Sequence, residues 1–131
     1  MTASSDMVLD TSVWITAFRG NEPEILERAR NLIAADRVVT CGPILFEIGR
    51  GIRRSERRSI LPLLGAVRAI PFDESDWPAA GEIDAELRGR GVTIPPMDVL
   101  IARACIREGL PLWTLDRHFE EIPGLDLIGL P

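Results

Sequence analysis

Residues 7–14 read MVLDTSVW, a short apolar run that ends at Asp10 and passes directly into two hydroxyl residues. The Val-Leu pair predicts the core of a short buried strand, which Asp10 ends. Thr11 and Ser12 are typical residues of a helix start, so we expect a helix to begin near Val13. A strand followed at once by a helix is the opening unit of a parallel α/β sheet.

Strand and helix patterns alternate along the rest of the chain. We expect further strands at 37–41, 67–72 and 112–115, an edge strand at 125–128, and helices at 24–35, from 42 onward, and at 57–64, 76–90 and 97–108. This alternation predicts a three-layer α/β/α sandwich with a central parallel sheet of four to five strands. We expect a single domain over residues 1–131, in which residues 1–6 form a flexible extension.

The composition limits the function classes. The chain has 131 residues, 46% of them hydrophobic, and a formal net charge of -5, which argues against binding nucleic acid through bulk positive charge. Its 15 basic residues are all Arg. The two cysteines, Cys41 and Cys105, lie in apolar surroundings without zinc-ligand spacing. Without a secretory signal or a membrane-length apolar run, the sequence predicts a cytoplasmic protein that makes no membrane contact.

Four carboxylates occupy positions where strands end or helices present an edge. They are Asp10, Glu47 in PILFEIGRG, Asp98 in IPPMDVLIARA and Asp116 in LWTLDRHF. Taken singly, each has an ordinary interpretation as a helix start, a solvated charge, a first-turn partner of the helix dipole or a turn residue. Because ligands of parallel sheets bind at the carboxyl ends of the strands, we expect the four to converge on one acidic pocket. Such a cluster is normally neutralised by a divalent cation, and a cation held by acids serves phosphoryl transfer.

Four segments resemble the PIN domain, and within that family the toxin ribonucleases of VapBC toxin–antitoxin systems. They are the LDTSVWI opening, PILFEIGRGI with Glu47, PPMDVLIA with Asp98, and TLDRHF with Asp116 and Thr114. The resemblance extends from Val8 to Ile128, and no acidic position departs from the family pattern.

The resemblance implies an endoribonuclease that depends on one or two Mg²⁺ or Mn²⁺ ions. It assigns the four acids Asp10, Glu47, Asp98 and Asp116 as catalytic residues and metal ligands. It further implies an RNA substrate and a homodimer, for which the helices expected from 42 onward and at 76–90 offer apolar contact surfaces. It also implies an antitoxin partner, and we expect that partner to insert a basic side chain into the acidic pocket.

Other residues are candidates for supporting roles. The hydroxyls of Thr11, Ser12 and Thr114 are expected to buttress the acids. Possible RNA contacts are Arg50, Arg53, Arg54, Arg117 and His118. The alternative is that the arginines of 49–58 form a solvated helix face and that His118 is a solvated loop residue. We expect the three tryptophans to be core residues rather than platforms for stacking bases.

Three rival functions share parts of this pattern. A catalytically silent PIN-fold binding module would lack catalytic acids, whereas all four are present. A receiver-like Mg²⁺-binding signalling domain requires a Lys near the last strand, and the chain contains none. A haloacid-dehalogenase-like phosphatase carries an Asp-x-Asp pattern, but Ser12 stands two residues after Asp10.

Overall fold

The computed structural model describes residues 6–129, and the strands of this part form one parallel five-stranded sheet in the order β3-β2-β1-β4-β5. The strands are β1 (Met7–Leu9), β2 (Val38–Cys41), β3 (Arg68–Ile70), β4 (Leu112–Trp113) and β5 (Leu127–Ile128). The predicted α/β class with a parallel sheet is therefore confirmed. The expected strands at 67–72 and 112–115 are shorter than predicted, as is the edge strand.

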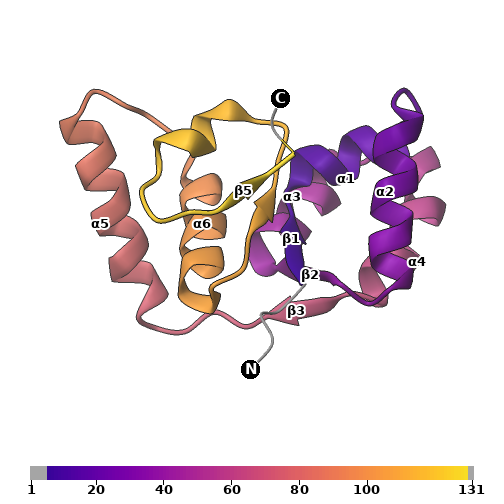
Figure 1. Ribbon diagram of the computed structural model, residues 1–131, viewed down its shortest axis with the longest axis horizontal. Coiled ribbons are helices and arrows are strands. Elements are labelled where there is room, and N and C mark those ends of the chain that lie inside the picture. The colour runs from indigo at the N-terminus through magenta and orange to yellow at the C-terminus, as the bar shows by residue number, and fades with distance from the viewer. Residues whose placement is uncertain (1–5, 130–131) are drawn as a thin grey trace.

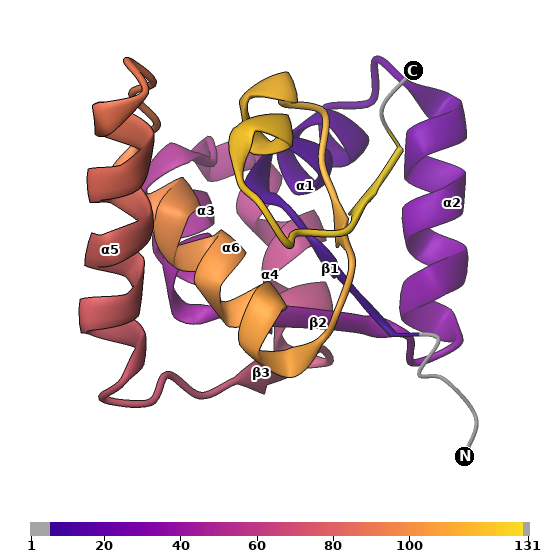
Figure 2. The ribbon, with the colours of Figure 1, turned by 60° about the vertical axis from the view of Figure 1, so that its left-hand side comes forward.

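Helices flank this sheet. They are α1 (Thr11–Phe18), α2 (Pro23–Ala34), α3 (Gly42–Gly51), α4 (Arg57–Gly65), α5 (Asp76–Gly89) and α6 (Pro96–Glu108), with short 3-10 helices η1 (Arg54–Glu56) and η2 (Arg117–Glu121). Figure 1 shows α5 and α6 at one end of the molecule, α1, α2 and α4 at the other, and the strands between them. Figure 2 shows β1 running between α6 and α2.

Local sequence explains where these elements start and stop. All three residues of β1 are buried, as expected for the central strand of a parallel sheet. Pro23, Pro43 and Pro96 each lie in the first turn of a helix, where the missing N–H costs nothing. Gly109 ends α6 with φ 65°, a left-handed conformation that glycine adopts without strain.

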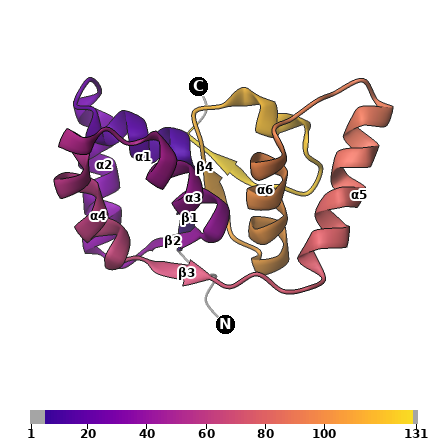
Figure 3. The same cartoon turned by 180° about the vertical axis from the view of Figure 1, so that it is seen from behind.

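The strand order places the end of β1 at a reversal point of the fold. From β1 the chain builds outward through β2 and β3, and then returns to the other side of β1 with β4. Figure 3 shows the molecule from behind, with α5 and α6 on one side, α1, α2 and α4 on the other, and β4 and α3 near the middle. Ligands of open α/β sheets bind at the carboxyl ends of the strands at such a point, which here is the edge occupied by Asp10 and Thr114.

The structure also bears on the predicted N-terminal extension, on the two cysteines and on membrane-spanning segments. The predicted flexible extension lies outside the described residues except for Asp6, which accepts a 2.6 Å hydrogen bond from Arg68 of β3. Cys41 and Cys105 are buried and unpaired. Within residues 6–129 no helix is both long enough and apolar enough to cross a membrane.

Candidate metal centre

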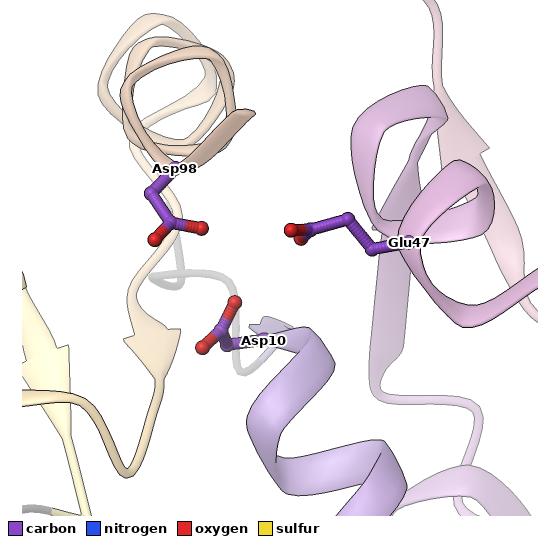
Figure 4. A group of neighbouring side chains, drawn as sticks. All are labelled: Asp10, Glu47 and Asp98. Atoms are coloured by element: carbon purple, nitrogen blue, oxygen red, sulfur yellow. The ribbon is translucent and has the colours of Figure 1, made fainter. Parts of the chain in front are cut away.

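Three carboxylates from separate elements meet above the end of β1. Asp10 follows β1, Glu47 lies in the middle of α3, and Asp98 is in the first turn of α6. Each contributes one oxygen to a group whose members all lie within 4.8 Å of one another. Figure 4 shows the three side chains converging from three directions on a common point. Oxygens at these separations can share a single divalent cation.

Asp116, the fourth predicted acid, lies at the edge of this group rather than inside it. It does not belong to the three-carboxylate cluster, but it lines the same pocket of about 310 Å³. The other lining residues are Asp10, Thr11, Ser12, Ile15, Thr16, Glu47 and Asp98. Ile15 and Thr16 were not predicted. Their spacing of one helical turn after Thr11 and Ser12 is the signal that identifies them.

Two hydroxyls hold Asp10. Ser12 Oγ donates a 2.7 Å hydrogen bond to Asp10 Oδ2, and Thr114 Oγ1 donates a 2.8 Å bond to the same atom. The other oxygen, Asp10 Oδ1, is buried and has no hydrogen-bond partner among residues 6–129. A buried carboxylate oxygen without a partner is costly, so its most favourable partner here is a cation in the pocket.

The hydroxyls at the start of α1 donate hydrogen bonds to the acids instead of capping the helix. Asp10 occupies the N-cap position, and no side chain makes a capping hydrogen bond there. Thr11 Oγ1 instead donates a 2.9 Å bond to Glu47 Oε1 on α3. The prediction that Thr11 and Ser12 supply N-cap chemistry is therefore wrong. The helix also begins at Thr11 rather than near Val13.

Asp98 has a partner that the sequence did not predict. His118 Nε2 lies 2.8 Å from Asp98 Oδ2, and the side chain of His118 is only 35% exposed. The interpretation of His118 as a solvated loop residue is therefore wrong. The contact spans 20 residues and joins η2 to α6, so no local pattern could reveal it.

Burial and the charges of neighbouring acids oppose the ionisation of Asp10 and Asp98. Burial raises the pKa of Asp10, and the charge of Asp116 adds to it, against hydrogen bonds from Ser12 and Thr114. Burial and then the charge of Asp10 raise the pKa of Asp98 to about 6, despite the hydrogen bond from His118. A divalent cation would offset both effects, since it supplies the opposite charge at short range.

The donor set fits a hard divalent cation. Carboxylate oxygens are the ligands that Mg²⁺ and Mn²⁺ prefer, and neither cysteine nor histidine is among the clustered donors. The unpartnered Asp10 Oδ1 points to the same fit.

The predicted RNA-contact arginines lie outside the pocket lining. Arg50 is exposed near the end of α3, and Arg53 and Arg54 are exposed just before η1 and at its first residue. The guanidinium of Arg50 lies 5.9 Å from the centroid of the Phe46 ring. Arg117 donates a 2.9 Å hydrogen bond to Glu120. Their contact with RNA stays a prediction.

The tryptophans divide into two groups. Trp14 and Trp113 are buried, as predicted. Trp77 is 56% exposed, so its prediction as a core residue is wrong. It lies in the first turn of α5 beside the exposed Leu45 and Phe46 of α3, around an apolar hollow of about 500 Å³.

Comparison with known proteins identifies the class that this fold and centre define. Residues 7–125 match the protein family described as PIN domain. Over 124 residues the chain is 31% identical to a protein named tRNA(fMet)-specific endonuclease VapC from Salmonella typhimurium, with 90% of this chain and 92% of that protein covered. The chain therefore belongs to the PIN domain family. This membership is inconsistent with the receiver-like and phosphatase-like alternatives.

Solved structures agree on the fold. A chain of the DNA-bound VapBC structure from Salmonella typhimurium matches with a TM-score of 0.75 and 26% identity, covering 94% of this chain and 96% of that one. A chain of VapBC2 from Rickettsia felis, bound to a DNA fragment from its promoter, matches with a TM-score of 0.75 and 23% identity, covering 93% and 96%. At the latter identity the likeness concerns the fold alone.

Proposed function

We propose that this protein is an endoribonuclease that depends on Mg²⁺ or Mn²⁺. One observation carries the proposal: three carboxylates near the end of β1 each place one oxygen within 4.8 Å of the others, and Asp10 Oδ1 is buried without a partner in the described part of the chain. That arrangement costs stability unless a cation is bound. It is therefore expected in a site selected for metal-assisted chemistry.

The residues of the acidic pocket have different roles in the proposed reaction. Asp10, Glu47 and Asp98 would hold the cation, and Asp116, at the edge of the pocket, would complete the acidic environment or orient the attacking water. A divalent cation supplies a Lewis acid for the phosphoryl oxygens and favours deprotonation of water. Thr11, Ser12 and Thr114 keep the carboxylates in place through the hydrogen bonds described above.

RNA is the substrate class that the Salmonella typhimurium relative favours. The Salmonella relative is named a tRNA(fMet)-specific endonuclease, and the present chain aligns with it over 92% of its length. The exposed arginines Arg50, Arg53 and Arg54 follow Glu47 along the chain and are suited to bidentate phosphate contacts. Arg117, next to Asp116, is a further candidate for contact with the RNA backbone. A local cluster of this kind attracts RNA although the whole chain is acidic.

We further propose that the protein is the toxin of a toxin–antitoxin pair and acts in the cytoplasm. One solved relative is described as DNA-bound VapBC, and another as a member of the VapBC family of toxin–antitoxin systems. The acidic pocket is complementary to an Arg or Lys side chain of an antitoxin, which would replace the charge of the cation. An antitoxin whose affinity is unchanged when the pocket acids are neutralised would contradict this mode of inhibition.

A homodimer is the assembly that the apolar face supports. Leu45, Phe46 and Trp77 are exposed together between α3 and α5, the two helices expected to form the contact. Large apolar side chains that are exposed next to one another are a feature of interaction surfaces. Phe46→Glu should convert a dimer into a monomer in sedimentation or light-scattering measurements, whereas Leu61→Glu, at a separate exposed apolar position on α4, should not. A wild-type protein that is monomeric at micromolar concentration would contradict the dimer.

The proposed nuclease activity is tested by identifying the chemical groups at the ends of the cleaved RNA. Purified protein and Mg²⁺ are incubated with a mixture of transfer, ribosomal and messenger RNA, and the products are tested for ligation and phosphatase sensitivity. We expect internal cleavage that leaves 5′-phosphate and 3′-hydroxyl ends, because water attacks the phosphorus. A 2′,3′-cyclic phosphate end would mean that the RNA 2′-hydroxyl attacks instead. No cleavage of any RNA, combined with tight RNA binding, would indicate a silent binding module.

A further inference from the structure

The three clustered carboxylates share one pattern of hydrogen bonding. Among the described residues, one oxygen of each accepts a side-chain hydrogen bond, and no such bond reaches the other oxygen. Asp10 Oδ2 is bonded by Ser12 and Thr114, Glu47 Oε1 by Thr11, and Asp98 Oδ2 by His118. Each side chain is thereby fixed in orientation, with one oxygen left for a cation. In this pattern His118 stands where the other two acids have a hydroxyl.

The environment of His118 favours a fixed ring. It lies in η2, and its imidazole packs against the ring of Phe119 with centroids 4.8 Å apart. Phe119 is fully buried, so this neighbour cannot easily move. The side chain of Asp98 is 10% exposed, and that of His118 is 35% exposed. A short hydrogen bond between two such restricted side chains fixes the carboxylate plane.

The two carboxylate oxygens of Asp98 point in different directions. Figure 4 shows one oxygen of Asp98 directed toward Glu47 and the other directed away from it. His118 approaches from η2, the segment that directly follows Asp116. Thr114 and His118 stand two residues before and two residues after Asp116, and they bond to Asp10 and Asp98 respectively. One short segment therefore holds two of the three clustered acids.

We propose that His118 is a positioning residue for metal binding: its Nε2–H donates to Asp98 Oδ2 and so directs Oδ1 toward the cation shared with Asp10 and Glu47. This inference rests on the proposed metal-dependent function, and it replaces the expectation that His118 contacts RNA. It assigns the proton of the imidazole to Nε2, because an ionised Asp98 can only accept.

The test compares Mn²⁺ affinity among variants of residue 118 by isothermal titration calorimetry, in the absence of RNA. His118→Ala removes the donor and should weaken Mn²⁺ binding about tenfold or more. His118→Gln places an amide nitrogen at a reach similar to that of Nε2, so it should restore most of the affinity. Glu121→Gln, an exposed change in the same 3-10 helix, should leave the affinity unchanged.

A second measurement separates positioning from RNA contact. At saturating Mn²⁺, His118→Ala should show a KM for RNA within about twofold of the wild type, because the ring does not touch the substrate. Should His118→Ala fail to fold, His118→Asn replaces it in the test. We expect His118→Asn to weaken Mn²⁺ binding to the same extent, because its shorter amide cannot reach Asp98. Circular dichroism establishes folding for each variant.

The outcomes are distinguishable. Mn²⁺ affinity that is equal in the wild type, His118→Ala and His118→Asn overturns the inference and leaves the proposed nuclease intact. A raised KM for RNA with unchanged Mn²⁺ affinity overturns it in favour of RNA contact. A wild-type protein that binds no Mn²⁺ at all overturns the proposed function, and the inference with it.

Discussion

The hydroxyl of Thr114 donates a 2.8 Å hydrogen bond to Oδ2 of Asp10, although 104 positions of the chain separate the two residues. The bond joins the ends of β1 and β4, which are neighbours in the sheet because the strand order reverses between them. It also ties the segment of Asp116 to Asp10, since the backbone N–H of Asp116 donates to the same hydroxyl over 3.0 Å. The sheet topology therefore brings together residues of the candidate metal centre that are distant in the sequence.

Replacing Thr114 should lower activity less than replacing an acid. Thr114→Val keeps the shape but removes the hydroxyl, so Asp10 retains only Ser12 and the Asp116 N–H loses its acceptor. We expect kcat/KM for RNA cleavage to fall about tenfold to a hundredfold, which is the usual effect of losing a group that orients a metal ligand. Thr93→Val, at an exposed position, is the matched control. A Thr114→Val enzyme with wild-type kcat/KM would contradict this role.

Metal binding should weaken as the pH falls through about 6. Burial and the charge of Asp10 raise the pKa of Asp98 to about 6, so below that pH its carboxyl is protonated and cannot act as an anionic ligand. We expect the Mn²⁺ dissociation constant to be nearly constant above about pH 7 and to increase steadily below about pH 6. Calorimetric titrations across this range measure the effect. A dissociation constant without pH dependence would show that Asp98 does not bind the metal.

The stability of the metal-free protein should change with pH in the opposite sense. Asp98 has a folded-state pKa of about 6 against 3.8 for its ordinary value. Its contribution to stability is therefore complete below about pH 4 and is lost as the pH rises through about 6. Near neutral pH, Mg²⁺ should raise the melting temperature, whereas near pH 5 it should raise it much less. Thermal melts in EDTA and in Mg²⁺ at both pH values test this, and an equal Mg²⁺ effect at both would contradict it.

The sequence predicts which strand and helices carry the clustered acids, for a physical reason. Buried parallel strands are apolar runs, and the residues that end them are polar, so the position of Asp10 after β1 is visible in MVLDTSVW alone. Proline in the first turn of α3 and of α6 marks where the helices that carry Glu47 and Asp98 begin. These signals lie within a few residues of the features they predict, so they can be recognised in the sequence alone.

Features that depend on contacts between distant segments were not predictable. The bond between His118 and Asp98 exists because η2 folds back over the start of α6, and nothing near either residue encodes that approach. Trp77 is exposed because only part of the surface of α5 packs on α6. Its apolar side chain alone suggested the core. Asp116 lies outside the cluster of three acids for a similar reason. Its position depends on where β4 ends in space, and its identity as an aspartate does not reveal that.

Stability should depend on a buried acid that does not line the acidic pocket, Asp76. Asp76 at the start of α5 is fully buried and accepts 2.8 Å hydrogen bonds from Arg103 and Arg107 of α6. Burial alone would raise its pKa, but hydrogen bonds from Arg107, the Asp73 backbone and Arg103 lower it to about 2. Its contribution to stability is therefore complete above about pH 4 and lost as the pH falls toward 2.

Asp76→Asn should lower the free energy of unfolding at neutral pH by about 3 kcal/mol, because two arginines lose their buried counter-charge. Urea denaturation measures this change. Asp84→Asn removes the exposed ion pair with Arg88 on the same helix and should cost less than about 1 kcal/mol. Equal effects of the two substitutions would contradict the account of Asp76.

The most direct test of the metal centre is RNA cleavage by the wild type and by Asp10→Asn, each with Mg²⁺ and with excess EDTA. The account predicts that EDTA abolishes wild-type cleavage and that added Mg²⁺ restores it. Asp10→Asn keeps the size but removes the charge at the centre of the cluster, and should cost about 4 kcal/mol of transition-state stabilisation, or about a thousandfold in rate. Asp126→Asn, the same change at an exposed position, should retain full activity. Cleavage that persists in EDTA, or at the wild-type rate in Asp10→Asn, would contradict the metal-dependent nuclease.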